Sequence, residues 1–270
     1  MDDLRSTFAY VSSVEHRLKS AAALLGISEN TLRTTLTESG IEVRRANQEN
    51  PNAPAVRLFD IQTIFAIAAY RRAKKLTKGP EGKKPVVIAV EIIKGGTGKT
   101  TTTCEVAVQL QLQGLKVMVI DIDIQANLTQ LMGYESDLSS DDADNFGLTQ
   151  DAIVNGTFAT ICSPIMDRKA RPVDAGSVIK YPFGPFGPAL IPSDTYFGDL
   201  ESAIVSSSGP RELAFQRFFN ESTAGRIPGL NVNDFDVVLF DCPPNVSFVA
   251  TNAIACADIV IAPVKMESFS

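Results

Sequence analysis

The first eighty residues carry apolar positions at helical spacing, interrupted by glycines. A short helix is predicted over residues 17–25, and four residues form its apolar face: Leu18, Ala21, Ala22 and Leu25. Gly26 supplies a turn, after which Ser28 can cap a second helix that begins at Glu29 and stops before Gly40. Leu32 and Leu36 of this helix, one turn apart, would face the core. The pattern therefore predicts a helix-turn-helix.

The residues that follow predict a short strand and a further helix. A polar loop over residues 47–54 leads to a strand over residues 56–59, and Asp60 caps the helix. The arrangement resembles the winged helix-turn-helix of the MerR-like class of DNA-binding domains. The resemblance implies that four residues reach the major groove: Asn30, Thr31, Arg33 and Thr34. It implies phosphate contacts for three arginines: Arg44, Arg45 and Arg57. The alternative is a small helical interaction module that does not contact DNA.

Two features of this region leave their roles open. An apolar stripe would either pair two subunits or pack on the helix-turn-helix: Leu4, Phe8, Val11 and Leu18. A cationic cluster would either contact phosphates or only complement a helix C-terminus: Arg71, Arg72, Lys74, Lys75 and Lys78. Residues 79–85, which contain Gly, Pro and Lys, predict a linker, so we expect residues 1–78 to form the first domain.

A second unit begins with an apolar, β-branched segment over residues 86–93, which predicts a strand buried on both faces. The segment leads into Lys94-Gly95-Gly96-Thr97-Gly98-Lys99-Thr100-Thr101, and a helical pattern then continues to Gly114. Strand, glycine loop and helix are the context of a phosphate-binding loop, because glycines let backbone N–H groups approach phosphates and a helix N-terminus favours anions. Ile93 replaces the first glycine of the usual pattern, so the match is to the deviant Walker A motif K-G-G-x-G-K-T.

Two later predicted strands end in carboxylates. One covers residues 116–121 and ends in Asp121, with Asp123 two positions further on; the other covers residues 237–241 and ends in Asp241. The carboxyl ends of parallel strands border the crevice where open α/β sheets bind ligands. Carboxylates there can hold Mg²⁺, directly or through water, and can orient an attacking water molecule.

Composition narrows the class of protein. Hydrophobic residues make up 44% and charged residues 21% of the 270 residues, which excludes wholesale disorder. No run approaches the ~18 apolar residues of a membrane span, and the N-terminus lacks the apolar segment of a signal peptide, so we expect a cytoplasmic protein. The four cysteines are scattered, and the single histidine, His16, is expected on a polar helical surface. Disulfide frameworks, zinc sites and serine-hydrolase triads are therefore excluded.

The net charge of −6 hides two opposite halves. Residues 1–84 hold 14 Lys and Arg against 9 Asp and Glu, whereas residues 85–270 hold 11 against 22. This asymmetry favours nucleic-acid binding by the N-terminal part and speaks against non-specific DNA binding by the second part alone.

Three segments together resemble the ParA family of partition ATPases, which is related to MinD: K-G-G-T-G-K-T-T, D-I-D-I-Q-A-N and V-V-L-F-D-C-P-P-N. The similarity runs from about residue 86 to the end and includes residues 189–193 and 258–264. A helix-turn-helix before such an ATPase resembles the larger plasmid-type members, which repress their own operon. The resemblance implies an α/β fold, with a doubly wound, mostly parallel sheet P-loop ATPase domain over residues 86–270 after a small, mainly α winged helix-turn-helix domain.

The resemblance also implies partners, cofactors and residue roles. ATP or ADP and Mg²⁺ would bind a homodimer, a ParB-like centromere-binding protein would stimulate slow hydrolysis, and operator DNA would bind the helix-turn-helix of a nucleoid-associated protein. Lys99 would contact the β- and γ-phosphates, and Lys94 would reach the partner subunit's nucleotide. The cradle would comprise Gly95, Gly96, Thr97, Gly98 and Thr101. Thr100 would bind Mg²⁺, Asp241 would serve it through water, Asp121 would assist, and Asp123 would position the attacking water.

The chain departs from the family in a few places. Ile124 stands where proline is usual, and residues 135–145 and 167–188 are expected to be surface excursions. The chain stops at Ser270, where family members continue, so we expect the ATPase domain to lack its C-terminal part. Two alternatives stay open: a nucleotide-sensing transcriptional regulator without a partition role, and a MinD-like positioning ATPase. The second is disfavoured because no amphipathic membrane-targeting helix is visible.

Overall fold

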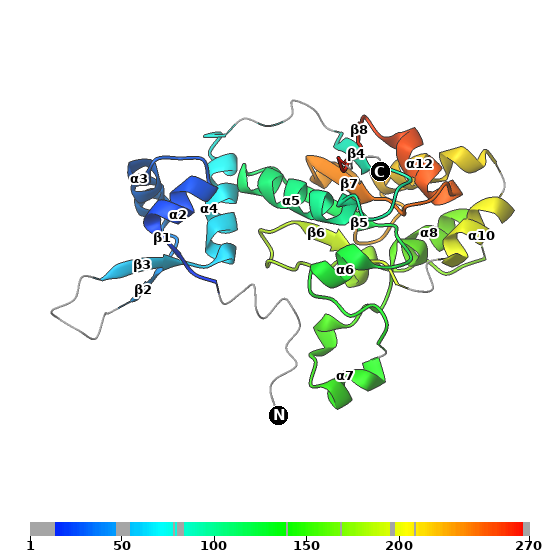
Figure 1. The fold of residues 1–270 in the computed structure, drawn as a ribbon, viewed down its shortest axis with the longest axis horizontal. Helices are drawn as coiled ribbons and strands as arrows, with labels where there is room; N and C mark the ends of the chain where they lie inside the picture. Colours follow the sequence, from blue (N-terminus) through cyan, green and yellow to red (C-terminus); the bar gives the residue numbers. More distant parts are fainter. Residues whose placement is uncertain are drawn as a thin grey trace.

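The computed structural model describes residues 14–46, 55–77, 79, 84–138, 140–167, 169–194, 198–207 and 209–266. It contains a small antiparallel sheet with three helices and a larger parallel sheet with helices on both faces (Figure 1). The two parts lie at opposite ends of the view, and α4 and α5 meet between them. Within the described residues, no helix is both long enough and apolar enough to cross a membrane.

The N-terminal part is built from six short elements. They are β1 (His16–Arg17), α2 (Leu18–Leu24), α3 (Glu29–Ser39), β2 (Arg44–Ala46), β3 (Val56–Phe59) and α4 (Ile61–Ala73). The strands form an antiparallel sheet in the order β1-β3-β2. Side chains from α2, α3, β3 and α4 share one buried apolar cluster, which includes Leu32, Phe59 and Phe65.

The local signals read from the sequence are present in this part. The Ser28 hydroxyl accepts a hydrogen bond from the Thr31 backbone N–H at 3.1 Å, and Gly40 ends α3 with φ of +67°. Asp60 caps α4 in the same way, accepting from the Thr63 N–H at 2.6 Å. His16 lies in strand β1, so its predicted helical setting is wrong: its backbone pairs with Phe59 of β3. The strands β1 and β2 span two and three residues, too few for a periodic pattern to reveal.

Several predicted features fall outside the described residues: Leu4, Phe8, Val11, the loop 47–54, Lys78, most of the linker and the last four residues. Leu18, the remaining member of the apolar stripe, packs against the N-terminal cluster.

The second part is a five-stranded parallel sheet in the order β6-β5-β7-β4-β8. Its strands are β4 (Val86–Val90), β5 (Val117–Asp121), β6 (Ala189–Ile191), β7 (Val237–Asp241) and β8 (Ile259–Ile261). The main helices are α5 (Lys99–Leu112), α6 (Asn127–Leu131), α7 (Ser140–Phe146), α8 (Phe158–Met166), α9 (Ala175–Val178), α10 (Gly198–Ser206), α11 (Ala214–Thr223) and α12 (Phe248–Cys256). Single 3-10 turns lie at Gln150–Ala152, Arg211–Leu213 and Val232–Asp234.

Alternating side chains of the central strands enter two separate cores. Met118, Ile120 and Phe240 face a core formed with α8, α10, α11 and α12, in which several phenylalanine rings pack edge to face. Val119 and Leu239 face the opposite core, formed with α5 and α6. Because both faces of each central strand are buried, these strands are continuously apolar, and the doubly wound arrangement follows.

The expectation that residues 135–145 and 167–188 are surface excursions is only partly met. Residues 140–146 form α7, which lies apart from the sheet in Figure 1. The second stretch instead contributes Ala175, Val178 and Ile179 to the core, and Lys180 forms a β-bridge with Leu190. The proline and glycine content predicted a loop there, but burial of a few apolar side chains orders the segment.

The two parts share an interface along α4 and α5. The Arg72 guanidinium forms an ion pair with Asp236 at 3.2 Å, and the same carboxylate accepts the Lys116 backbone N–H at 2.8 Å. The ring of Phe65 packs against Phe183, with centroids 5.8 Å apart. The predicted linker therefore connects parts that are in contact.

Contacts within the fold account for two of the five members of the cationic cluster at the end of α4, Arg71 and Arg72. Arg71 is buried and donates to the Thr35 hydroxyl at 3.3 Å, while Arg72 pairs across the interface. Lys74 lies over the ring of Tyr70, 5.7 Å from its centroid. The two arginines thus stabilise the fold and do not form a phosphate-contacting surface.

Gly114 packs closely against α4, which provides a test of this interface. Its φ is +86°, and a Cβ there would meet the Ala68 carbonyl oxygen and the Arg72 Cβ at 2.9 Å. We expect Gly114→Ala to lower the free energy of unfolding by about 3 kcal/mol, measured by denaturant titration. Gly40→Ala is the matched control, because Gly40 has φ of +67° but open space around it, and should cost only about 1 kcal/mol. Equal losses for the two variants would contradict close packing at Gly114.

Candidate functional site: a phosphate-binding loop beside buried carboxylates

The glycine loop lies between the end of β4 and the start of α5. Gly96 and Gly98 have φ of +70° and +87°, which side-chain-bearing residues rarely adopt. No atom lies within 4 Å of a Cβ built on Gly95, Gly96 or Gly98, so the loop backbone faces open space. Gly98 caps α5 without a side-chain hydrogen bond, which leaves the first N–H groups of the helix to a ligand.

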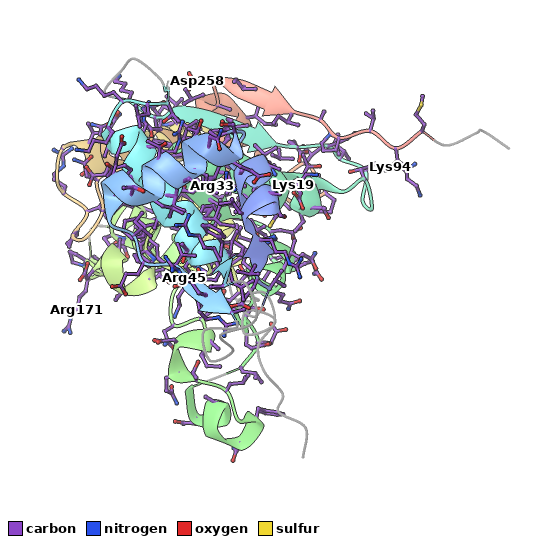
Figure 2. The ribbon with its side chains drawn as sticks, turned by 90° about the vertical axis from the view of Figure 1, so that its left-hand side faces the viewer. Lys19, Arg33, Arg45, Lys94, Arg171 and Asp258 are labelled. Carbon is purple, nitrogen blue, oxygen red and sulfur yellow. The ribbon has the colours of Figure 1, made fainter. Side chains whose placement is uncertain are left out.

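Lys99 is the first residue of α5 and is 7% exposed. Its ammonium donates a hydrogen bond to the Ile92 carbonyl at 3.2 Å, which folds the side chain back over the loop. A buried cation at a helix N-terminus with open space beside it is suited to bind phosphate oxygens. Lys94 lies at the exposed rim of the loop, where Figure 2 shows it projecting away from the body of the protein.

Asp121 and Asp241 are direct partners in the register of β5 and β7, and Val90 of β4 pairs with Asp241 from the other side. The sheet therefore aligns both carboxylates with the start of the phosphate-binding loop. The Thr103 hydroxyl donates to Asp241 Oδ1 at 2.8 Å, and the hydroxyls of Thr103 and Thr100 both lower the pKa of this carboxylate against the effect of its burial. Asp241 Oδ2 is buried and has no hydrogen-bond partner in the described part of the chain.

An unpaired buried carboxylate oxygen beside the Thr100 hydroxyl fits a hydrated cation. Among the described residues, no group of three or more His, Cys, Asp or Glu could hold a metal ion. Mg²⁺ rarely uses such a cage; it takes one or two protein oxygens and completes its shell with phosphates and water. The residues present at this site therefore fit Mg²⁺ that arrives with a nucleotide.

Asp121 is fully buried, and its oxygens are already occupied. Oδ2 accepts from the Thr129 N–H at 2.9 Å and from its hydroxyl at 2.7 Å, and Oδ1 accepts from the Asp123 N–H at 3.1 Å. The Thr129 hydroxyl accepts in turn from the Ser193 N–H at 2.9 Å. Asp121 thus ties β5, α6 and the end of β6 together, and it fixes the backbone of Asp123.

Asp123 is 5% exposed and accepts a hydrogen bond from the Gln125 N–H at 3.0 Å. Burial raises its pKa, while that hydrogen bond and the charge of Lys99 lower it. The turn ends at Ala126, which has φ of +50°. A non-glycine residue in this conformation is strained, and such strain is common beside functional sites.

Glu91 was not singled out from the sequence, yet it lies directly before the loop and is 9% exposed. Its Oε2 has no hydrogen-bond partner in the described residues, and burial raises its pKa against the charge of Lys99. An acidic residue inside an apolar strand pattern was the signal that could have identified it.

The seven predicted DNA-binding residues lie on the N-terminal part. Four side chains are exposed on α3: Asn30, Thr31, Arg33 and Thr34. The Arg33 guanidinium bonds Asn30 at 3.0 Å and Glu29 at 3.2 Å. Arg44 pairs with Glu15 at 2.7 Å, whereas Arg45 and Arg57 lie directly opposite each other on β2 and β3. The structure thus brings Arg33, Arg45 and Arg57 to one basic cleft, and Arg44 lies outside its lining.

Comparison with known proteins identifies the family. A protein-family model described as an AAA domain matches residues 85–270. The Caulobacter vibrioides chromosome partitioning protein ParA is 28% identical over 184 residues, which is 68% of this chain and 57% of that protein. The chain belongs to the ParA-type AAA-domain family.

Other relatives extend the ParA-type likeness. A Rhizobium rhizogenes protein that carries the name replication protein A is 28% identical over 267 residues. The match covers 92% of this chain and 57% of the Rhizobium protein. The chain thus spans a little over half the length of the curated relatives it matches. A solved structure from Mycobacterium smegmatis, named as a cobyrinic acid a,c-diamide synthase with a bound ATP analogue and magnesium, matches with 26% identity and a TM-score of 0.50. That match covers 68% of this chain and 62% of the other.

The buried carboxylates make stability depend on pH. Burial raises the pKa of Asp241 to about 6, and burial together with the charge of Asp241 raises the pKa of Asp121 to about 7. Both folded-state pKa values lie above those of the unfolded chain, so the two buried carboxyls contribute fully to folding stability below about pH 4, where they are protonated. This contribution to stability is lost as pH rises through 6 and 7. We expect the ligand-free protein to lose stability over this range, and Asp241→Asn to recover about 2 kcal/mol at pH 8.

Thermal unfolding between pH 4 and 8 measures this effect. The exposed carboxylate of Asp141 on α7 provides the control, since Asp141→Asn should leave the pH profile unchanged. A profile of Asp241→Asn identical to that of the wild type would show that Asp241 is not held with a raised pKa.

Proposed function

We propose that this protein is a DNA-partition ATPase that binds ATP and Mg²⁺, dimerises around the nucleotide and binds operator DNA. The observation that carries the proposal is the alignment of the Lys94–Thr101 loop with the buried carboxylates Asp121 and Asp241 at one sheet edge. The Caulobacter ParA relative and the magnesium- and ATP-analogue-bound Mycobacterium structure support it.

In this proposal, the loop binds the triphosphate. The backbone of five residues and the first turn of α5 surround the phosphates: Gly95, Gly96, Thr97, Gly98 and Thr101. Lys99 contacts the β- and γ-phosphates, for which its ammonium exchanges its bond to the Ile92 carbonyl.

The Thr100 hydroxyl and, through water, the unpaired Oδ2 of Asp241 would hold Mg²⁺. When bound, it neutralises charge that develops on the phosphates during transfer. Asp123 positions the attacking water. Asp121, whose oxygens already accept three hydrogen bonds, acts through Asp123 and Thr129 and not as a direct ligand.

Hydrolysis requires a second copy in this scheme, because Lys94 acts on the partner's nucleotide as an arginine finger does elsewhere. Its exposed place at the rim of the loop supports this role. Three apolar side chains at the same sheet edge are also exposed, by 62%, 41% and 79%: Ile93, Ile124 and Val246. Apolar surface around a nucleotide site favours a face that a second subunit covers.

The N-terminal part serves as a winged helix-turn-helix that binds operator DNA and represses the protein's own operon. The exposed residues of α3 read bases: Asn30, Thr31, Arg33 and Thr34. Strands β2 and β3 contact the DNA backbone through Arg44, Arg45 and Arg57. A ParB-like centromere-binding protein stimulates hydrolysis. The Rhizobium relative supports a single protein that combines the two parts, because its alignment covers 92% of this chain.

A nucleotide-sensing regulator without a partition role is the second candidate, and the contact between α4 and α5 favours it, since it would couple nucleotide binding to DNA binding without cargo. Dependence of ATP turnover on a centromere-binding protein distinguishes the two. A MinD-like positioning ATPase would instead show nucleotide-dependent binding to lipid vesicles.

The phosphate-binding role of Lys99 is tested by Lys99→Ala. We expect ATP affinity to fall at least 100-fold, because a charge-assisted contact to two phosphates is lost in a buried site. Isothermal titration calorimetry measures the affinity, and circular dichroism checks the fold. Lys169→Ala, which removes an exposed lysine after α8, is the matched control. Tight ATP binding by Lys99→Ala would contradict the assignment of this loop to the nucleotide site.

The trans role of Lys94 is tested by mixing variants. Lys94→Ala and Asp123→Ala should each bind ATP and each turn over at under about 1% of the wild-type rate. In a mixed dimer, the Asp123→Ala subunit supplies Lys94 to a nucleotide whose own Asp123 is intact. An equimolar mixture should therefore regain about a quarter of the wild-type rate. A mixture as inactive as either variant alone would place Lys94 on its own subunit's nucleotide.

A further inference from the structure

The N-terminal part contains a cleft of about 470 Å³ in which every ionisable lining residue is a cation. Its lining comprises Arg17, Leu18, Lys19, Arg33, Arg45, Ala55, Val56 and Arg57. The cations come from β1, α2, α3, β2 and β3, so residues far apart in the sequence converge on one place. Figure 2 shows Lys19, Arg33 and Arg45 on the N-terminal part, on the side that faces the viewer.

The pairing of β2 with β3 places Arg45 directly opposite Arg57. Cβ atoms of such partners are about 5 Å apart, and like charges in this position destabilise a hairpin. The pairing of β2 with β3 covers only three residue pairs, so it supplies little stabilisation to offset that repulsion. An anion between the two guanidinium groups removes the repulsion, so the pairing points to an anionic ligand.

Nearby carboxylates neutralise little of the cleft. Glu29 pairs with Arg33 at 3.2 Å, and Glu15 pairs with Arg44, which does not line the cleft. Within the part of the chain that the structure describes, no carboxylate forms an ion pair with Arg17, Lys19, Arg45 or Arg57. Among the described residues, four positive charges of the cleft are therefore without an ion-pair partner.

We propose that this cleft binds the sugar-phosphate backbone of duplex DNA, an inference that rests on the proposed DNA-binding function. Guanidinium groups match phosphate geometry, and a charge spread over several elements fits a run of phosphates better than one small anion. The proposal adds Arg17 and Lys19 to the DNA-contacting residues. It also moves Arg33 from base reading to the backbone, because its guanidinium lies in the cleft and is held there by Glu29 and Asn30.

The salt dependence of DNA binding tests the proposal. Fluorescence anisotropy of the full chain is measured on a duplex from upstream of its own gene and on a shuffled duplex of equal length, at about 50 to 200 mM salt. Variants are Arg17→Gln, Lys19→Gln, Arg33→Gln, Arg45→Gln and Arg57→Gln. Each should lower the slope of log K against log salt by about 0.9, with an equal affinity loss of about threefold to tenfold on both duplexes.

Arg171→Gln is the matched control, because Arg171 is an exposed arginine outside the N-terminal part (Figure 2). It should keep the wild-type slope. Thermal melting of Arg45→Gln and Arg57→Gln should be at or above the wild-type Tm, since each removes a like-charge pair. Lys19→Gln changes an exposed helix position, so its result stands even if a hairpin variant unfolds.

The outcomes separate this inference from the proposed function. The wild type could bind DNA normally while Arg45→Gln, Arg57→Gln and Lys19→Gln keep the wild-type salt slope. That result would overturn backbone binding by the cleft and leave the proposed operator binding intact. A loss for Arg33→Gln on the specific duplex alone would return Arg33 to base reading. A wild-type protein that binds neither duplex would overturn both operator binding and backbone binding by the cleft. The proposed ATPase activity is tested separately by the Lys99 and Lys94 variants.

Discussion

The carboxylate of Asp241, buried at the end of β7 beneath the phosphate-binding loop, is the group on which the site depends. The Thr103 hydroxyl donates to one of its oxygens, and the other oxygen has no partner in the described residues. Asp121 adds a second buried acid in register beside it. Burial raises the pKa of both acids, the charge of Asp241 raises that of Asp121 further, and the charge of Asp123 raises that of Asp241. A site with this imbalance favours a cation, and Lys99 and a metal ion that arrives with phosphates would both supply one.

Helix α5 joins this site to the rest of the molecule. It starts at Lys99 in the loop and runs for 14 residues, or about 21 Å, to the contact of Gly114 with α4. Val108 and Leu112 on the same helix pack into the N-terminal core. A rigid helix with one end in each part gives any movement of the loop a direct route to α4. The ion pair between Arg72 and Asp236, which precedes β7, joins the parts at a second point.

Charge is divided between the parts in a way that suits two different ligands. The basic cleft on β1, α2, α3, β2 and β3 places Arg45 and Arg57 directly opposite each other, which costs folding stability. The carboxyl end of the parallel sheet holds two buried acids, Asp121 and Asp241, whose pKa values burial raises. A ligand of the opposite charge would relieve each arrangement, which supports the two proposed binding sites. The net charge of −6 alone conceals this division.

Local chemistry determined much of this protein from the sequence alone. The glycine pattern, the serine and aspartate caps and the continuously apolar strands specify their elements within a few residues, because each depends on neighbours in the chain. The tertiary structure decided what depends on distant residues. The strand register places Asp121 opposite Asp241. Packing directs Arg71 and Arg72 to partners within the fold. The pairing of β2 with β3 places Arg45 opposite Arg57. The roles of such side chains follow from partners tens of residues away, and no local pattern encodes that distance.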